Sequence, residues 1–390
     1  MNLPDVLNSR YLPLGIDLSG SVLRVLQFRR RSRGLEVASA VRADLAPPGG
    51  SPFEPGSDAH VQAICSALQK RVAAREFHGR SCVITLDDRL VRIRSVRLPR
   101  MPDDELDRAV AIDAPGRLGF SEKEAAEVAW IRAGEVRQGD DFRDEIIMIG
   151  ASRDPTERLV FGLAAIGLRP LAVEPSFAGV ARAYSRTLRR NDDQDVVKVI
   201  ADIGTLSTGV TIIRGQSVVF HKPIEIGGDA MTKAAATRLG LEYQSILDLR
   251  RQRMSGAPIE ARVERAMFEA IRPTIMDIAN EVSLCLRYFG VSFRGMRTES
   301  CIVTGRDAAE PQLAELVGEV LRLPTAVGNP FDGIDVRRSP LINTSSCTSE
   351  WAVAAGLGLR SLKPAASRVP GHRRQADGTR SLSPARREAA

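Results

Sequence analysis

The chain has 390 residues, of which 43% are apolar and 26% charged, a composition typical of a globular protein large enough for two domains or several subdomains. Its net charge is +7, yet aromatic residues make up only 5%, which argues against a protein that binds nucleic acid by stacking bases on aromatic rings. Five cysteines without a CxxC pair and four scattered histidines exclude a zinc knuckle, a disulfide framework and an HExxH site. No apolar run reaches about 18 residues and no signal peptide is present, which predicts a cytoplasmic protein that does not insert into the membrane.

The first predicted element is a β-hairpin over residues 12–28, LPLGIDLSGSVLRVLQF. An apolar run ends in Asp17, and an alternating strand extends from Val22 to Phe28. The turn between them holds Ser19, Gly20 and Ser21. Such a turn offers backbone N–H groups to an anion, and an acid at its edge can hold the magnesium that accompanies a polyphosphate. By itself, the pattern also fits an ordinary hairpin.

Residues 87–171 differ in pattern from the segments around them, and we interpret them as an α+β insert. The segment 90–98, LVRIRSVRL, alternates apolar and basic residues, which predicts a half-solvated strand. A helix, two strands, a second helix and a closing strand at 168–173 complete the insert. A helix at 176–188 then returns the chain to the parent domain.

The second half opens with a hairpin that repeats the first, at residues 197–213, VKVIADIGTLSTGVTII. An apolar run again ends in an acid, Asp202, and a turn of small and hydroxylated residues follows. The turn includes Gly204, Thr205 and Thr208. A third strand at 216–224 completes a meander. Two acid-tipped hairpins in one chain predict a duplicated α/β unit with a ligand held between the copies.

The remainder of the second half is mostly helical by its apolar periodicity. The predicted elements are helices at 230–239, 243–253, 259–289, 311–321 and 350–359 and a strand at 299–304. A glycine pair, Gly227–Gly228, precedes the first of these helices, and the strand leads directly into Gly305. From about residue 364 the chain is rich in arginine, serine and proline without apolar periodicity, which predicts disorder.

These motifs resemble those of actin-like ATP-binding proteins. GIDLSGSVLRVLQF, ADIGTLSTGVTII and IVTG at 302–305 look like the phosphate 1, phosphate 2 and adenosine motifs. The chain is more particularly similar to the PilM family, actin-like proteins of type IV pilus assembly that are related to the division protein FtsA. The likeness extends over about residues 11–362. It is carried by the order of LPRMPDDEL, AIGLRPLAVEPSFAGVARA, IGGDAMT, NEVSLCLRYF, LRLPTAVGNPFDGI and WAVAAGLGLRS.

The resemblance implies an α/β actin-like ATPase fold, in which two ribonuclease-H-like halves surround a nucleotide cleft and a small α+β subdomain is inserted. The expected divisions are 11–86 with 172–190 for the first half, 87–171 for the insert, 196–362 for the second half and 363–390 for a disordered basic tail. The implied cofactors are ATP and Mg, with Asp17 and Asp202 holding the metal through water. The implied nucleotide-binding residues are Asp17, Ser19, Gly20, Ser21, Asp202, Gly204, Thr205, Thr208, Gly227, Gly228 and Gly305.

The nucleoside side departs from the family pattern at three positions. Arg306 stands where a second glycine usually follows Gly305, so its guanidinium would either crowd the adenine or stack on it. Leu247 stands where the family has an acid, and Arg250 where it has a lysine. Loss of a buried hydrogen-bond partner of the ribose costs roughly 1–3 kcal/mol, so we expect weak or absent nucleotide binding.

The function implied by the resemblance is that of a cytoplasmic adaptor, peripheral to the inner membrane through its partners. It would bind the cytoplasmic N-terminal segment of a bitopic PilN-like protein and connect it to pilus motor and platform proteins, with ATP as a conformational ligand, slow ATPase activity at most, no catalytic residue assigned and no nucleic-acid partner. The strand at 90–98 is a candidate docking site for an extended peptide, although a solvated strand face fits equally well.

Two alternatives stay open. The first is an ATPase or phosphotransferase of the same superfamily, for which Glu174 and Asp202 are available acids. We interpret Glu174 as a surface acid at a strand end. The second is a membrane-associated filament protein like FtsA. A homo-oligomer and a secretion system in place of a pilus are also compatible with the sequence.

Overall fold

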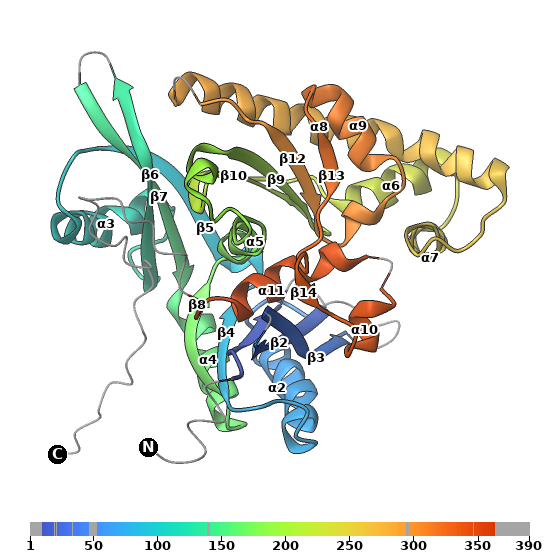
Figure 1. Ribbon diagram of the computed structural model, residues 1–390, viewed down its shortest axis with the longest axis horizontal. Helices are drawn as coiled ribbons and strands as arrows, with labels where there is room; N and C mark the ends of the chain where they lie inside the picture. The colour runs from blue at the N-terminus through green and yellow to red at the C-terminus, as the bar shows by residue number, and fades with distance from the viewer. Residues whose placement is uncertain are drawn as a thin grey trace.

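The structure is a computed structural model (Figure 1), and it describes residues 10–18, 20, 22–32, 34–46, 53–138, 141–293, 296–345 and 347–362. Ser19, Ser21 and the predicted basic tail lie outside the described residues. The described chain forms two large sheets and one small sheet, with helices packed on them. Within this part of the chain, no helix combines the length and the hydropathy that a membrane crossing needs.

The first large sheet has six strands in the order β14-β3-β2-β1-β4-β8. The strands are β1 (Leu14–Asp17), β2 (Val22–Arg31), β3 (Gly34–Asp44), β4 (Ser81–Thr85), β8 (Arg169–Glu174) and β14 (Ile334–Asp335). β1 pairs antiparallel with β2 and parallel with β4. The helices on one face are α2 (Asp58–Ala73) and α4 (Arg153–Ala165). Ile64 of α2 and Leu163 of α4 share a core with Ile16 of β1, so the apolar run predicted before Asp17 is the centre of this half.

The second large sheet repeats this arrangement in the order β11-β10-β9-β12-β13. The strands are β9 (Val197–Ile203), β10 (Thr208–Arg214), β11 (Ser217–Ile224), β12 (Ser300–Thr304) and β13 (Thr325–Val327). β9 pairs antiparallel with β10 and parallel with β12, as β1 does with β2 and β4. The same strand order and directions confirm the predicted duplication and the fold of two related α/β halves around one cleft.

The helices of the second half pack on one face of its sheet (Figure 1). They are α6 (Gly228–Leu239), α8 (Ala261–Ser292) and α9 (Leu313–Leu321). Helix α7 (Tyr243–Met254) packs against α6, and the short α10 (Pro340–Asn343) follows β14. α8 is the long predicted core helix. Its residues Ile271, Ile275 and Ile278 recur at helical spacing and are buried in the core with Val199 of β9.

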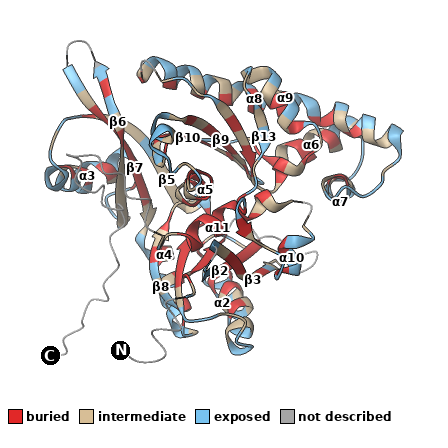
Figure 2. Ribbon diagram, viewed as in Figure 1, coloured by how far each residue is buried: buried red, intermediate tan, exposed pale blue. Residues whose placement is uncertain are grey.

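Two helices, α5 (Ser176–Ser185) and α11 (Ala352–Gly358), lie between the large sheets and are mostly buried (Figure 2). They belong to a core that includes Val83 of the first sheet and Ile200 of the second. The backbones of the two helices touch, because a Cβ on Gly356 would lie 1.7 Å from the carbonyl oxygen of Gly179. A Cβ on Gly15 of β1 would likewise lie 2.0 Å from a backbone oxygen of α11. Small residues therefore set a short distance between α5, α11 and the first sheet.

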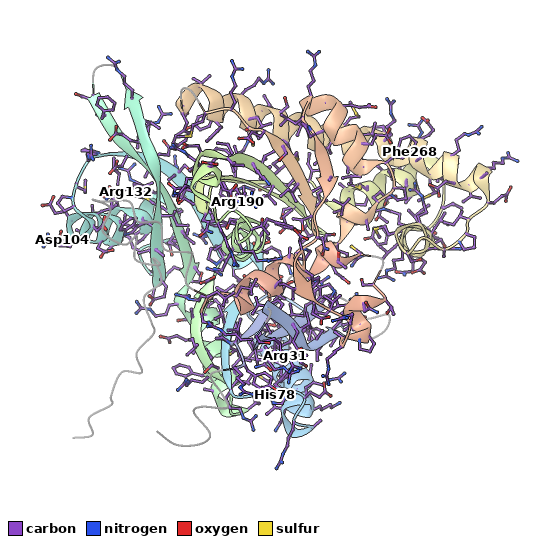
Figure 3. All side chains as sticks on the ribbon, viewed as in Figure 1. Arg31, His78, Asp104, Arg132, Arg190 and Phe268 are labelled. Carbon is purple, nitrogen blue, oxygen red and sulfur yellow. The ribbon has the colours of Figure 1, made fainter. Side chains whose placement is uncertain are left out.

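The insert has its own sheet, in the order β5-β7-β6, with one helix against it. These elements are β5 (Val91–Pro99), α3 (Asp103–Arg117), β6 (Ala126–Gln138) and β7 (Asp141–Ser152). Arg132 of β6 (Figure 3) lies 3.0 Å from Asp103 in the first turn of α3 and donates to the Met101 carbonyl at 3.1 Å. These contacts fix the start of α3 to the sheet.

β5 is a half-solvated strand, as the sequence predicts, because most of its residues are partly exposed and Arg94 is exposed. Arg92 and Arg94 donate to the carbonyls of Gly119 and Arg117, at 2.6 and 2.9 Å. These carbonyls lie at the C-terminal end of α3, where backbone oxygens have no partner within the helix. Arg92 and Arg94 therefore cap α3 from a face that is still partly open to solvent.

The insert also packs on the second half of the protein. Ile147 of β7 shares a core with Phe220 of β11 and Phe289 of α8. Arg97 of β5 donates to Ser292 Oγ at the end of α8, at 2.9 Å. The strand predicted to close the insert, β8, instead pairs with β4 in the first large sheet. The insert thus begins and ends in the first half and makes contact with the second.

We expect Gly356→Ala to lower the free energy of unfolding by at least about 3 kcal/mol, because overpacking usually costs about 1–3 kcal/mol and here the methyl group would meet backbone, which cannot rotate away. Urea denaturation measures this loss. The matched control is Gly290→Ala in α8, where a Cβ meets no atom within 4 Å and the protein should gain roughly 0.5–1 kcal/mol. Similar effects of the two substitutions would contradict the packing of α5 against α11.

Candidate functional site

Three carboxylates come together where the two large sheets face each other. Asp17 is the last residue of β1, and Asp202 stands at the end of β9, the equivalent strand of the second sheet. Asp88 lies in the turn after β4. It is near both of these acids, because its charge acts on Asp202 and the charge of Asp17 acts on it. Asp17 is buried, Asp202 is half-buried and Asp88 is exposed, so solvent reaches the site. The structure brings the two predicted acids together and adds a third.

Burial and the proximity of the other acids raise the pKa values of Asp202 and Asp88. Burial, and then the charges of Asp88 and Asp17, raise the pKa of Asp202 from an ordinary value of 3.8 to about 7. The surrounding protein raises the pKa of Asp88 to about 6 even though solvent reaches its side chain, and the charge of Asp87 acts in the same direction. A hydrogen bond from Ser176 Oγ to Asp88, at 2.6 Å, opposes this rise. A cation placed among the carboxylates would relieve their repulsion.

Arg24 of β2 is the cation nearest to this cluster that is fixed by ion pairs. Its guanidinium lies 3.5 Å from Asp17 and 2.9 Å from Glu350, and its side chain is buried. None of the described arginines or lysines reaches salt-bridge distance of Asp88 or Asp202. Within the same part of the chain, no three His, Cys, Asp or Glu side chains are arranged to ligate a metal ion directly.

The predicted phosphate 2 turn and the glycine pair form one compact unit. At the tip of the β9–β10 hairpin, the Gly204 carbonyl accepts the N–H of Gly228 at 2.9 Å. The Thr205 carbonyl accepts the N–H of Asp229 at 2.8 Å. A Cβ on Gly227 would lie 2.6 Å from the Gly204 oxygen, so only glycine permits this close approach.

The other predicted residues take different positions. Thr208 is buried, and its hydroxyl donates to the Ile226 carbonyl at 2.7 Å, where it stabilises the turn. Gly20 has a left-handed φ of +63°. Gly305, with φ +90°, lies against the acid cluster, because a Cβ on it would be 2.6 Å from Asp202 Oδ1. Their contacts with a nucleotide stay a prediction.

Two buried arginines occupy the predicted nucleoside side, between α7 and the loop after β12. Arg250, which is 1% exposed, donates to Glu310 at 2.8 Å and to Asp307 at 2.9 Å. Arg253 donates to the same Glu310 and, at 2.8 Å, to Glu264 of α8. Arg250 also donates to the Gly228 carbonyl at 2.6 Å. The residue aligned with the family's lysine is therefore bound inside the protein, while Leu247 is half-buried on the same helix.

Asp88 was not among the predicted site residues, although the sequence around it carries a signal. An apolar strand at 81–86 runs into Asp87 and Asp88, which is the pattern that identified Asp17 and Asp202. Only the turn of small residues is absent. Arg24 gave no such signal, because its partner Glu350 is 326 residues away in the chain.

Glu174 is a correction to the sequence interpretation, because it is buried and not a surface acid. It accepts hydrogen bonds from Arg182 of α5 at 2.8 Å and from Arg360 beyond α11 at 2.6 Å. These pairs join β8 to both central helices. With both carboxylate oxygens engaged, Glu174 has a structural role.

A cavity of about 540 Å³ adjoins the loop after β12, which begins at Gly305. Its walls include Met254, Ala309, Glu310, Asn329, Thr348 and Ser349. Ser349 donates to the Gly305 carbonyl at 2.9 Å, which places the cavity next to this loop. None of the predicted nucleotide-binding residues lines the cavity, so it is distinct from the carboxylate cluster.

Comparison with known proteins finds a family model described as "Type IV pilus assembly protein PilM", which matches residues 15–362. Among solved structures, the chain is similar to one described as "PilM-PilN type IV pilus biogenesis complex", with a TM-score of 0.73 and 20% identity over 91% of this chain and 100% of the other. It is also similar to the ethanolamine utilization protein EutJ from Carboxydothermus hydrogenoformans, with a TM-score of 0.50 and 11% identity over 90% of this chain and 89% of the other. These structures support the actin-like fold.

We expect Asp202→Asn to stabilise the protein more at pH 7.5 than at pH 5. The folded-state pKa of Asp202 is raised to about 7, so the folded protein holds a proton that the unfolded chain releases, and the free energy of unfolding falls as the pH rises from about 4 to about 7. The neutral amide removes this loss, which we expect to be on the order of 1–2 kcal/mol. Urea denaturation of both proteins at the two pH values measures it.

The control is Asp277→Asn on the exposed side of α8, which should have the same small effect at both pH values. If Asp202→Asn lowered the stability at pH 7.5, the repulsion among the three carboxylates would be disproved.

We expect Arg250→Met to lower the free energy of unfolding by about 3–5 kcal/mol, because it leaves the buried acids Asp307 and Glu310 without their main cation. Arg251→Met is the matched control on the same helix. Arg251 is exposed and, among the described residues, pairs with the exposed Asp248, so its loss should cost less than about 1 kcal/mol. Chemical denaturation compares the two, and equal losses would refute the buried network.

Proposed function

The chain belongs to the PilM family of type IV pilus assembly proteins, and we propose that it is an actin-like adaptor in the inner-membrane platform of a type IV pilus or a related secretion system. The observation that carries this proposal is the extent of the likeness, since the family model spans residues 15–362 and the solved relative is matched over its whole length. The proposed partner is the cytoplasmic N-terminal segment of a bitopic PilN-like protein. That partner would hold the adaptor at the cytoplasmic face of the inner membrane and connect it to motor and platform proteins.

Within this proposal, ATP with magnesium is a conformational ligand of the cleft. The residues present fit such a ligand for two reasons. Crowded carboxylates gain from a divalent cation, and the hairpin tip is a turn of small and hydroxylated residues, apart from the exposed Leu206, next to a glycine pair. Asp17 and Asp202 would hold the metal through water. The residues beside the phosphates would be Gly20, Gly204 and Thr205, and those beside the nucleoside Gly227, Gly228 and Gly305. The cation would supply the charge that offsets the acids and the phosphates.

The position of the acids supports a conformational role. Asp17 and Asp202 belong to different halves, so a ligand that engages both favours one arrangement of the halves over others. The insert is continuous with the first half but packs on the second through Ile147, Phe289 and the Arg97–Ser292 hydrogen bond. A change in the cleft would therefore change the contacts of the insert, where we expect the partner to bind.

The docking site that we propose is the edge of β5. Val96 and Leu98 of β5 pack with α3 and Ile93 packs with the second half, so the surface that we propose for a partner is the backbone edge of the strand. Among the described strands, β5 pairs only with β7, so its other edge retains unpaired N–H and C=O groups. An extended peptide can add to such an edge as a further strand.

Slow ATP hydrolysis is a second candidate, which one observation favours. Asp88 is reached by solvent, is oriented by Ser176, and has a pKa of about 6. A carboxylate with these properties is suited to accept a proton from water near neutral pH.

We expect a peptide with the N-terminal cytoplasmic sequence of the PilN-like protein from the same genome to bind the full-length chain and to slow amide hydrogen exchange in β5. The other edge strand of the same sheet, β6, is the internal control and should exchange at an unchanged rate. Magnesium and ATP should alter the peptide affinity, and Asp17→Ala/Asp202→Ala should abolish this alteration. Hydrogen exchange by mass spectrometry and fluorescence anisotropy provide the measurements.

The outcomes separate the hypotheses. No peptide binding with or without nucleotide would refute the adaptor. Binding with protection at β6 and not at β5 would refute only the docking site. Sustained phosphate release far above that of Asp17→Ala/Asp202→Ala would replace a pure adaptor with an ATPase.

A further inference from the structure

Arg306 is a half-buried cation without a partner in the described part of the chain. It follows Gly305 at the end of β12 and precedes the short turn Asp307–Ala309. Its side chain is neither exposed nor engaged, since none of the described residues makes a hydrogen bond or an ion pair with its guanidinium. A guanidinium withdrawn from water without an acid is unfavourable unless another anion approaches it.

Four charges act most strongly on Arg306. The largest effect comes from the acid Asp307, and the other three come from the cations Arg251, Arg24 and Arg250. Burial lowers the pKa of Arg306, and the charges of Arg251 and Arg24 act in the same direction. The three neighbouring arginines have acids of their own. These acids are Glu350, Glu310 and Asp248, at 2.9, 2.8 and 3.0 Å.

Asp307, the acid that acts most strongly on Arg306, is already bound to Arg250. Asp307 accepts a hydrogen bond from Arg250 at 2.9 Å, and its second oxygen, Oδ2, is buried without a hydrogen bond to any described residue. The guanidinium of Arg306 therefore does not extend to Asp307 but leaves its charge for another group.

The position of Arg306 connects the acid cluster with α7. The preceding residue, Gly305, is packed against Asp202, since a Cβ there would lie 2.6 Å from its carboxylate. On the other side, the charge of Arg306 acts on the hydroxyl of Tyr243 in the first turn of α7. An anion held between the two halves would thus lie next to this guanidinium.

The two phosphate turns lack a cation of their own. Residues 17–22, DLSGSV, and residues 202–208, DIGTLST, contain no lysine or arginine. The acids Asp17, Asp88 and Asp202 add negative charge beside them. A polyphosphate in this cleft needs positive charge besides that of its metal, and a guanidinium can give two parallel N–H groups to one phosphate.

We propose that Arg306 binds a phosphate group of the ligand, so that this cleft recognises a nucleoside polyphosphate through a cation in the adenosine loop. This inference rests on the proposed function, because it takes a nucleotide as the ligand of the cleft. The other roles open to Arg306 are stacking on the base and obstruction of the nucleoside site. They predict different effects of substitution.

The test is calorimetric binding of four probes, each with magnesium, to the full-length chain. The probes are ATP, ADP, adenosine and inorganic tripolyphosphate. Arg306→Gly should weaken ATP and ADP binding on the order of tenfold or more and leave adenosine binding unchanged. Arg306→Lys should retain part of the affinity because it keeps the charge but loses the two parallel N–H groups. Arg272→Ala, on the exposed side of α8, is the control and should bind all probes as the wild type does.

ATP binding by Arg306→Gly that equals or exceeds the wild-type affinity would overturn the inference and leave the proposed function intact. An equal loss for adenosine and ATP would assign Arg306 to the base and also overturn it. The wild type could instead bind tripolyphosphate but not ATP, and Arg306→Gly could lose this binding. That result would support the phosphate contact and overturn ATP as the conformational ligand. Failure of the wild type to bind any probe would overturn both.

Discussion

The backbone contact between Gly179 and Gly356 determines how near the two large sheets can come. A side chain at either position would push α5 and α11 apart, and with them the strands that they separate. The glycines themselves bury little apolar surface. The contact between α5 and α11 is therefore stabilised by the valines and leucines packed around it. The consequence for function is electrostatic. Because β1 and β9 occupy equivalent places on either side of these helices, Asp17 and Asp202 are held in one site despite their repulsion.

The two halves have kept the same strand order but use equivalent loops in opposite ways. β4 continues as Thr85-Leu86-Asp87-Asp88, and β12, its counterpart, as Thr304-Gly305-Arg306-Asp307. Asp88 and Asp307 thus stand at the same distance from equivalent strands. Asp88 faces solvent and the other carboxylates, whereas Asp307 is buried with Arg250. The loop after β4 thus contributes negative charge that a cation can offset. The loop after β12 contributes an acid whose charge is already offset by Arg250.

The parts of the fold that the sequence predicted are those that depend on local pattern. The two hairpins could be predicted because strand, turn and strand are contiguous in the sequence, with an acid at the end of the first apolar run. The repetition of this pattern indicated the duplication. Alternation correctly predicted a half-solvated strand for β5, but it did not predict that Arg92 and Arg94 cap α3, because alternation reports which residues share a face and not what they contact. Glu174 was misread because one of its arginines lies 186 residues away. The two-residue strand β14 has no periodicity to detect, and it forms only because β3 offers it an edge.

The changes on the nucleoside side are physically connected. An arginine buried at 250 requires acids within reach, and they come from Asp307 and Glu310, beyond β12, while Leu247 of its own helix is apolar. Such a network is stable only when complete, since removal of one member leaves a buried charge unpaired. Replacement of Leu247 by an acid alone would therefore add a negative charge to a region where three acids already share two arginines. With Arg250 and Arg253 committed to the interior, Arg306 is the arginine of this region whose charge is left for a ligand. In the proposed nucleotide cleft, the acid that would contact the ribose is therefore absent, and the charge of Arg306 is suited to a phosphate.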